Sequence, residues 1–184
     1  ILKSDIIVDL IKVLGCGIEI KNKYNKNLNN FNLKNLRWSK IIICTDADVD
    51  GYQIRTLLLT MFYRLMPSLI ENGKIYIAES PLYEIIVNDK SMFAFTEQEK
   101  NKIVSGLKGK KYIIQRSKGL GENNPDMMWQ TTMNPQTRRL IQVVPEGIEE
   151  TNEVFNLLLG DNLQGRKEYI AEHGSKYLND IEVV

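Results

Sequence analysis

Three carboxylates at alternate positions are the side chains of this sequence most suited to chemistry. Asp46, Asp48 and Asp50 lie in the segment 45–51, directly after the apolar run 41–44. Carboxylates this close repel one another unless a divalent cation neutralises them. Hard oxygen ligands favour Mg²⁺, with Ca²⁺ or Mn²⁺ as alternatives. The pattern therefore predicts a magnesium site on this loop.

The elements around the acids place them at one end of a sheet. Residues 41–44 are β-branched and apolar, which is typical of a strand buried on both faces of a parallel sheet. Apolar residues then recur at three- and four-residue spacing from Ile54 to Met66, so we expect a helix that ends near Pro67. The acids would lie between the carboxyl end of a strand and the amino end of a helix, where open α/β sheets bind ligands.

Further elements follow on both sides of this loop. Ser4 and Gly15 bracket a predicted opening helix, as cap and terminator. Downstream, the patterns predict a strand over 73–78, a hairpin over 82–95 that turns at Asn88 and Asp89, a helix over 97–107, and a strand over 112–116. A glycine-bearing turn over 117–122 comes next, which is turn punctuation or a phosphate cradle.

The last third of the chain is predicted to be all helical. Asn124-Pro125 and Asn134-Pro135 each place a cap before a first-turn proline, and later helices end at Gly160 and Gly174. Trp129 is expected in the core of this tail. We place the domain boundary near Arg116, which gives domains of 1–116 and 117–184.

Charge is segregated although the net charge is only +1. Residues 1–40 carry 8 basic and 3 acidic side chains and residues 90–142 carry 10 and 4, whereas residues 41–89 carry 3 and 7 and residues 143–184 carry 3 and 9. Two basic blocks around an acidic centre suit a polyanion that approaches a bound metal; solvated faces of alternating charge are the alternative.

The cysteines and the hydropathy of the sequence indicate the cellular compartment of the protein. Cys16 and Cys44 have no zinc-like spacing, and Cys44 is expected in the core. There is no signal peptide, and Arg55 and Arg64 interrupt the longest apolar helix, so we expect a cytoplasmic protein without a membrane span. The sequence opens without methionine, which suggests a piece of a longer protein.

Two other acid-rich motifs fit less well. An EF-hand loop that begins at Asp46 needs a glutamate at its twelfth position, where this chain has Leu57. A haloacid-dehalogenase-like phosphatase also places Asp-x-Asp after an apolar strand, and Val49 fits its pattern. The expected acidic pair on a later strand end is missing, so this phosphatase is a minor alternative.

A third family fits over nearly the whole chain. Residues 45–51, 54–60, 62–64 and 66–67 resemble the TOPRIM domain of the B subunit of bacterial type IIA topoisomerases, the group that contains DNA gyrase and topoisomerase IV. Residues 73–78, 81–83, 115–116, 118–122, 124–125, 129, 131–133 and 160–161 resemble later motifs of the same polypeptide in the same order. The resemblance implies an α/β fold with a Rossmann-like parallel sheet flanked by helices, followed by a small, mostly helical tail.

The resemblance also implies a function. A tyrosine of the A subunit would attack a backbone phosphate of double-stranded DNA, assisted by Mg²⁺ held in this domain, within an A2B2 heterotetramer whose upstream domains use ATP. Asp46 and Asp48 would be the catalytic acids and first-choice ligands. Asp50 is predicted either as an outer ligand or as the cap of the following helix.

Two cations are predicted near the DNA phosphates. Arg55 would lie on the first turn of the helix after the acids and Lys118 in the glycine-bearing turn. The alternative for Arg55 is an ion pair with Asp46 or Asp50. Arg138 and Arg139 are expected to contact either DNA or acids of the tail.

The chain departs from the family's motifs at several places, and these departures limit how far the family's residue roles can be assigned to it. The family's Glu-Gly-Asp-Ser-like and Arg-Gly-Lys-like motifs are missing, Tyr52-Gln53 replaces the usual Ser-His, and Ser117 replaces a tyrosine. We therefore expect weak Mg²⁺ binding and no strand cleavage from this chain alone. A non-catalytic scaffold that docks DNA or the A subunit is the competing class, and the sequence does not separate gyrase from topoisomerase IV.

Overall fold

The computed structural model describes residues 2–20, 30–117, 119–145 and 147–177. The chain forms two compact units, Ile1–Val143 and Val144–Val184. This division differs in place from the domain boundary expected at Arg116, which stays a prediction.

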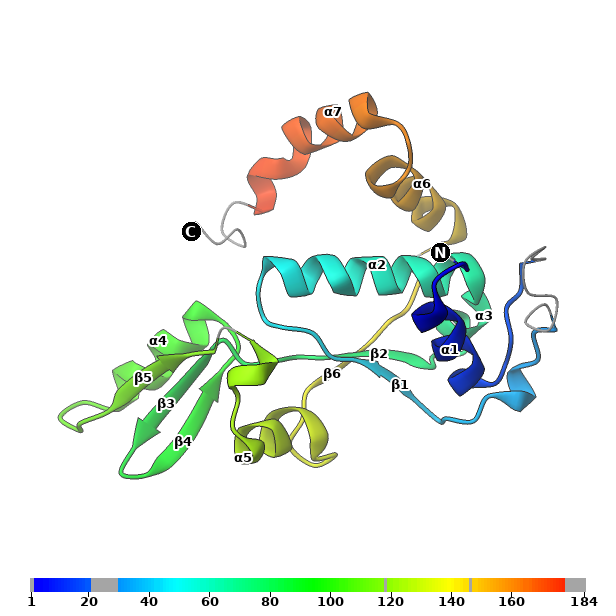
Figure 1. Ribbon diagram of the computed structural model, residues 1–184. Helices are drawn as coiled ribbons and strands as arrows, with labels where there is room; N and C mark the ends of the chain where they lie inside the picture. Colours follow the sequence, from blue (N-terminus) through cyan, green and yellow to red (C-terminus); the bar gives the residue numbers. More distant parts are fainter. Residues whose placement is uncertain (1, 21–29, 118, 146, 178–184) are drawn as a thin grey trace. The chain divides into compact units, whose positions relative to one another are not determined.

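Sheet A is the scaffold of unit 1. It contains β1 (Ile41–Ile43), β2 (Ile75–Ala78) and β6 (Leu140–Gln142) in the order β1-β2-β6 (Figure 1). The β1–β2 pair is parallel and the β2–β6 pair is antiparallel. Two residues of β1 are only half buried, contrary to the expected burial on both faces, because β2 is its only partner strand among the described residues.

Three helices pack on sheet A. They are α1 (Asp5–Leu14), α2 (Val49–Leu65) and α3 (Pro67–Glu71). Phe62, Leu69 and Ile75 are among the buried residues of the core that these helices share with β1 and β2. The αL conformation of Gly15 ends α1 as predicted, whereas the Ser4 side chain makes no cap hydrogen bond.

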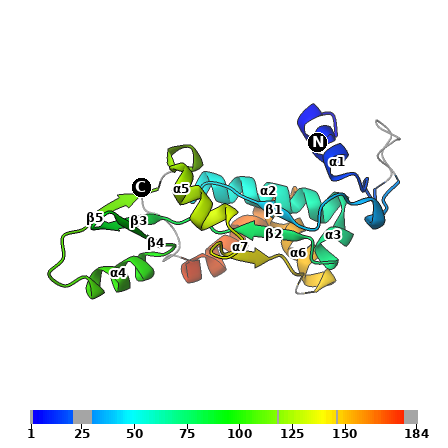
Figure 2. The ribbon, with the colours of Figure 1, turned by 90° about the horizontal axis from the view of Figure 1, so that it is seen from below.

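Sheet B is a separate antiparallel sheet in the order β4-β3-β5. It contains β3 (Tyr83–Val87), β4 (Lys90–Ala94) and β5 (Ile113–Arg116), and α4 (Glu97–Gly106) packs on it. Both views show this sheet beside sheet A and not stacked on it (Figures 1 and 2). The hairpin turns at Asn88 and Asp89 as predicted, and both have positive φ, as a two-residue hairpin turn requires.

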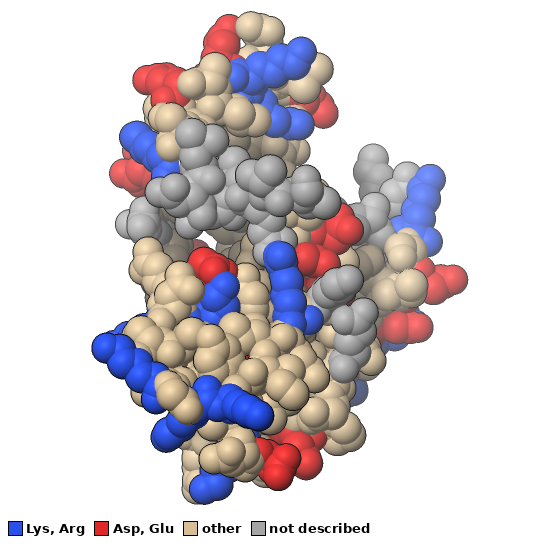
Figure 3. All heavy atoms as spheres, turned by 90° about the vertical axis from the view of Figure 1, so that its left-hand side faces the viewer, with Lys and Arg blue, Asp and Glu red and all other residues tan. Residues whose placement is uncertain are grey.

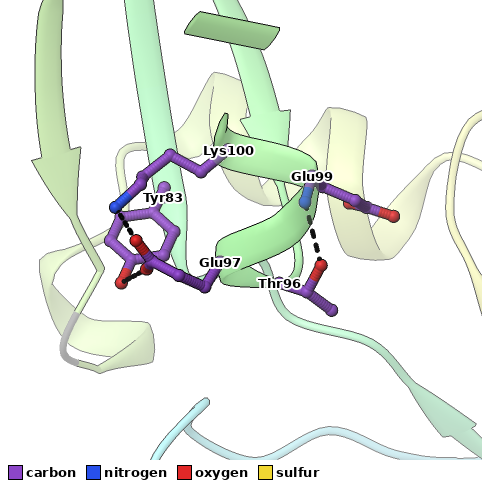
Figure 4. A network of polar contacts seen from close by, with 5 residues as sticks. All are labelled: Tyr83, Thr96, Glu97, Glu99 and Lys100. Carbon is purple, nitrogen blue, oxygen red and sulfur yellow. Dashed lines mark hydrogen bonds and ion pairs between the residues drawn. The ribbon is translucent and has the colours of Figure 1, made fainter. Parts of the chain in front are cut away.

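A polar network holds α4 on sheet B (Figure 4). The Thr96 hydroxyl accepts the backbone N–H of Glu99 at 3.1 Å and so caps the helix. The Tyr83 hydroxyl donates to Glu97 at 2.6 Å, and Lys100 pairs with the same carboxylate. The bond to Glu97 is the main reason that the pKa of Tyr83 is raised.

Arg139 links the two sheets of unit 1. Its guanidinium donates to Glu99 on α4 at 2.8 Å and lies 3.9 Å from the ring centre of Phe95. Its carbonyl accepts the backbone N–H of Glu79, just after β2, at 3.1 Å. Arg139 therefore pairs with an acid of α4 and not with an acid of the tail, while its expected contact with DNA stays a prediction.

The segment between β5 and β6 is compact but not wholly helical. It contains a 3-10 turn, η3 (Leu120–Glu122), then α5 (Pro125–Met128) and a π-helical turn, η4 (Trp129–Met133). Asn124 caps α5 as predicted. The prediction for Asn134 was wrong: it begins a turn whose next residues lead into β6, because its carbonyl and side chain accept backbone N–H groups locally. Trp129 is 56% exposed and so does not lie in a core.

Unit 2 is helical. It contains α6 (Ile148–Leu159), α7 (Leu163–His173) and a final 3-10 turn, η5 (Gly174–Tyr177). None of its described side chains is buried. An α/β fold with a mostly helical end is confirmed, although β6 interrupts the region expected to be all helical. Across the described ranges, no helix combines the length and the apolar character needed to cross a bilayer.

Candidate active site at the carboxyl end of β1

The acidic loop joins β1 to α2, as the sequence predicts. Thr45 is buried, and its carbonyl accepts the Ser80 hydroxyl at 3.1 Å, which ties the loop to the chain after β2. Asp46 comes next, Asp48 is the N-cap of α2, and Asp50 lies in the first turn of that helix. The three acids therefore lie within a short stretch at one end of sheet A.

Asp46 connects this loop to the glycine-bearing turn. Its Oδ1 accepts the backbone N–H of Leu120 at 2.7 Å, across a separation of 74 residues. Gly119 also lies against this carboxylate, since a Cβ added there would be 3.5 Å from Asp46 Oδ2. A hydrogen bond to an ionised carboxylate is one of the stronger kinds, so it fixes the orientation of Asp46.

Asp48 is fixed by its own helix. Its Oδ1 accepts the backbone N–H of Gly51 at 2.7 Å. The cap is therefore Asp48 and not Asp50, which corrects that alternative. Gly51 has no room for a side chain, because an added Cβ would lie 2.1 Å from the carbonyl oxygen of Asp46.

The two fixed carboxylates fit Mg²⁺ in donor type but not in number. Among residues whose placement is described, no group of three or more Asp, Glu, His or Cys side chains is arranged to hold a metal ion. Mg²⁺ takes six oxygen ligands and usually keeps several waters, with one or two carboxylates from protein. Asp46 and Asp48 can supply such carboxylates, and the remaining ligands must come from elsewhere.

Arg55 follows the acids on α2. It stacks over Tyr52, 5.0 Å from the ring centre, and its Nε is buried without a hydrogen-bond partner in the described part of the chain. The alternative ion pair with Asp46 or Asp50 does not form among these residues. Lys118 lies outside the described residues, so its predicted contact with phosphate is not placed.

Cys44 lies among polar side chains that the sequence did not indicate. Burial raises the pKa of its thiol; hydrogen bonds with Ser80 and Thr132 and the charge of Arg55 act in the opposite direction, while Asp46 adds to the rise. Cys44 is half buried and not a fully buried core residue as expected. Ser80, Thr132 and the Leu120 amide all reach the acidic loop from distant segments, and no local sequence pattern marks them.

A small cavity lies beside the glycine-bearing turn. It has a volume of about 150 Å³ and is lined by Glu84, Gln115, Arg116, Ser117, Asn123, Asn124 and Met127. Glu84 is 7% exposed and accepts the hydroxyl of Ser91. The Ser117 hydroxyl donates to Asn123 at 2.7 Å, which closes the turn and holds its backbone near Asp46.

Basic side chains lie on the other end of unit 1 from α1. Figure 3 shows Lys and Arg spread over the part formed by sheet B and α4, where Lys90, Lys108, Lys110 and Lys111 are exposed. These lysines belong to the second basic block of the sequence. They give this end of the unit an exposed cationic surface.

Comparisons with known proteins match both parts of the chain. Residues 4–80 match the Toprim domain, and residues 109–171 match the carboxyl terminus of the DNA gyrase B subunit. The DNA gyrase B subunit of Thermotoga maritima is 44% identical over 96% of this chain, and that of Archaeoglobus fulgidus is 42% identical over 100%. The DNA topoisomerase 4 B subunit of Mycoplasma capricolum is 42% identical over 100% of this chain. The chain spans only 26% or 27% of the length of these relatives.

Proposed function

Because the chain belongs to the B-subunit family of type IIA DNA topoisomerases, we propose that it supplies part of the magnesium site at which such an enzyme breaks and rejoins DNA. The attacking tyrosine would come from an A subunit in an A2B2 heterotetramer in the cytoplasm. ATP would be used by domains upstream of this chain. Double-stranded DNA is the proposed substrate.

The observation that carries this proposal is the fixed pair of carboxylates at the carboxyl end of β1. Asp46 is held by the Leu120 amide and Asp48 by the Gly51 amide. Each bond uses one carboxylate oxygen, Oδ1, and within the described residues Oδ2 of both side chains makes no hydrogen bond, so it can serve as a metal ligand. Such backbone bonds act as the outer contacts that orient metal ligands.

The roles of the other site residues follow from their places. Mg²⁺ bound here would polarise the scissile phosphate and stabilise negative charge on the leaving oxygen. Asp50, in the first turn of α2, would act as an outer ligand. Arg55 and Lys118 would contact DNA phosphates, and the buried Nε of Arg55, which has no hydrogen-bond partner among the described residues, is consistent with a group that gains a partner when substrate binds.

A scaffold role is the second candidate, and one observation favours it. The same hydrogen bonds that orient Asp46 and Asp48 also close the loop and cap α2, so both side chains stabilise the fold even without a metal. In that case the chain would only dock DNA or the A subunit. The two candidate functions make opposite predictions for the rate of DNA cleavage when an aspartate is replaced by the uncharged asparagine.

The test uses the full-length B subunit assembled with its A subunit. Asparagine is as good an N-cap as aspartate, whereas alanine costs about 1 kcal/mol. Asp48→Asn should therefore keep folding and assembly but lower DNA cleavage by at least about 100-fold if the charge binds Mg²⁺. Asp48→Ala should lose both cleavage and some stability.

The outcome that favours the scaffold is cleavage by Asp48→Asn at the rate of the unchanged protein. Asp50→Asn is the matched control, because replacement of an outer ligand should lower cleavage less than replacement of Asp48.

A magnesium titration of the 184-residue chain should show weak binding, and low-micromolar affinity would contradict our view that its site is incomplete. Introduction of negative supercoils by the full-length pair would identify a gyrase rather than a topoisomerase IV.

A further inference from the structure

A second candidate binding surface lies at the amino ends of β1 and β2, at the opposite end of sheet A from the acids. It is a depression of about 690 Å³, within the usual range of ligand sites, about 300–1,000 Å³. Its walls come from η2 (Leu33–Asn35), the segment before β1, and the turn before β2. The lining residues are Asn32, Leu33, Lys34, Leu36, Arg37, Trp38, Ser39, Asn72 and Lys74.

The depression is cationic. Lys34, Arg37 and Lys74 line it, and no carboxylate does so within the described ranges. Basic side chains around one depression repel one another. This repulsion is small where water or an anionic ligand lies between them. The side chain of Arg37 also lies over Gly15, at the end of α1, where a cation complements the helix dipole. This interaction with α1 accounts for Arg37 but does not account for Lys34 and Lys74.

Trp38 adds an aromatic surface to these cations. Its side chain is 52% exposed, although its indole N–H donates to the carbonyl of Val13 at 3.0 Å. The neighbouring backbone N–H, that of Arg37, donates to Leu14 at 3.1 Å, so the end of α1 holds both residues. A large ring that is fixed by a hydrogen bond yet half open to solvent is suited to stacking.

We propose that this depression binds an unpaired strand of nucleic acid, with one base stacked on Trp38 and phosphates near Lys34, Arg37 and Lys74. A positively charged groove combined with an aromatic ring is the usual arrangement in proteins that bind single strands. An acidic peptide would satisfy the cations but would not use the indole face. A duplex keeps its bases stacked inside and offers none to Trp38.

This inference goes beyond the proposed magnesium site and does not depend on it. The depression shares no residue with the acidic loop. Replacement of Asp46 or Asp48 by asparagine should leave strand binding unchanged, so failure of one proposal does not decide the other.

Trp38 itself provides the measurement. The chain has two tryptophans, and Trp129 is also exposed, so the Trp129→Phe variant of the 184-residue chain leaves Trp38 as the only indole. An oligothymidylate of about 12 nucleotides, within the usual span of single-strand sites, is the probe. We expect it to quench Trp38 fluorescence and to bind more weakly as salt rises.

Substitutions then test the geometry. Trp38→Ala should weaken binding about 5- to 150-fold, as loss of one stacked base does, whereas Trp38→Phe should retain most of it. Binding of these variants is followed by anisotropy of a labelled strand, and their thermal melting shows whether the fold is kept. Lys34→Gln should lower the slope of log K against log salt by about 0.7, the value for one single-strand phosphate contact.

Three results would overturn the proposal. The first is no quenching of Trp38 at saturating oligonucleotide. The second is equal weakening by Lys90→Gln, an exposed lysine on sheet B that serves as the matched control, because that would show attraction to overall charge. The third is equal affinity for polyglutamate, which would indicate a surface for an acidic protein.

Discussion

Unit 1 and unit 2 of this chain are stabilised in different ways. All of the described buried side chains lie in unit 1, where helices and strands share a core around Phe62 and a smaller one around Ile85. In its described part, unit 2 has helices α6 and α7, of which only α7 has a side-chain cap, Asn162, and it has no buried side chain. Helices of this length are marginal in water without packing. Unit 1 should therefore unfold cooperatively, and unit 2 should open more readily.

The largest expected contrast comes from one phenylalanine in each unit. Phe62 is 2% exposed, and Phe62→Ala should destabilise unit 1 by about 3–5 kcal/mol. Phe155 in α6 is only half buried, so Phe155→Ala should destabilise unit 2 by only about 1–2 kcal/mol. Hydrogen exchange, read separately for each unit, would measure both effects. Equal losses would show that unit 2 has a core as tight as that of unit 1.

A pair of glycines gives the next contrast. Alanine at Gly51 would bring its Cβ to 2.1 Å from the backbone oxygen of Asp46, so Gly51→Ala should cost about 2–3 kcal/mol or more. Alanine at Gly165 in α7 would lie 2.6 Å from the side-chain amide of Asn162, which can rotate away only by losing its cap bond with the Gly165 N–H, at a cost of about 1 kcal/mol. Gly165→Ala should change stability by less than about 1 kcal/mol, since alanine also favours the helix. Chemical denaturation of the two variants is the measurement, and a large loss at Gly165 alone would reverse the comparison.

The smallest expected effect is a pH dependence of unit 1. The Arg139 guanidinium, and then the backbone N–H of Phe95, hold the pKa of Glu99 below its ordinary value. A carboxylate whose folded-state pKa is lowered stabilises the protein above its unfolded pKa and loses that contribution as pH falls through the folded value. Because both side chains are partly exposed, the contribution should be about 0.2–1 kcal/mol.

Thermal melting from pH 7 down to about pH 3 tests this link. Arg139→Gln should remove most of the acid-sensitive part that comes from Glu99. The matched variant is Arg138→Gln, because the Arg138 guanidinium donates, among the described residues, a long bond of 3.5 Å to the carbonyl of Met133. A larger effect at Arg138 than at Arg139 would contradict the link between the sheets.

Several features followed from the sequence because their causes lie within a few residues. The αL terminator at Gly15, the turn at Asn88 and Asp89, and the cap at Asn124 each depend on the conformational preference of one or two residues. The position of the acids between β1 and α2 followed from an apolar run and a helical repeat. The family resemblance also followed from motifs in order, and the comparisons confirmed it.

Other features were decided only when distant segments met. The bond from Leu120 to Asp46, the pairing of β6 with β2, and the link from Arg139 to Glu99 join residues tens of positions apart. No local propensity records such pairings, because they depend on which backbone groups remain unpaired after the chain has packed. The sequence by itself therefore determined which chemical groups stand at the end of β1 and that Asp48 lies where it can cap its own helix, whereas the tertiary structure decided how Asp46 is held, because its partner, the Leu120 amide, is 74 residues away.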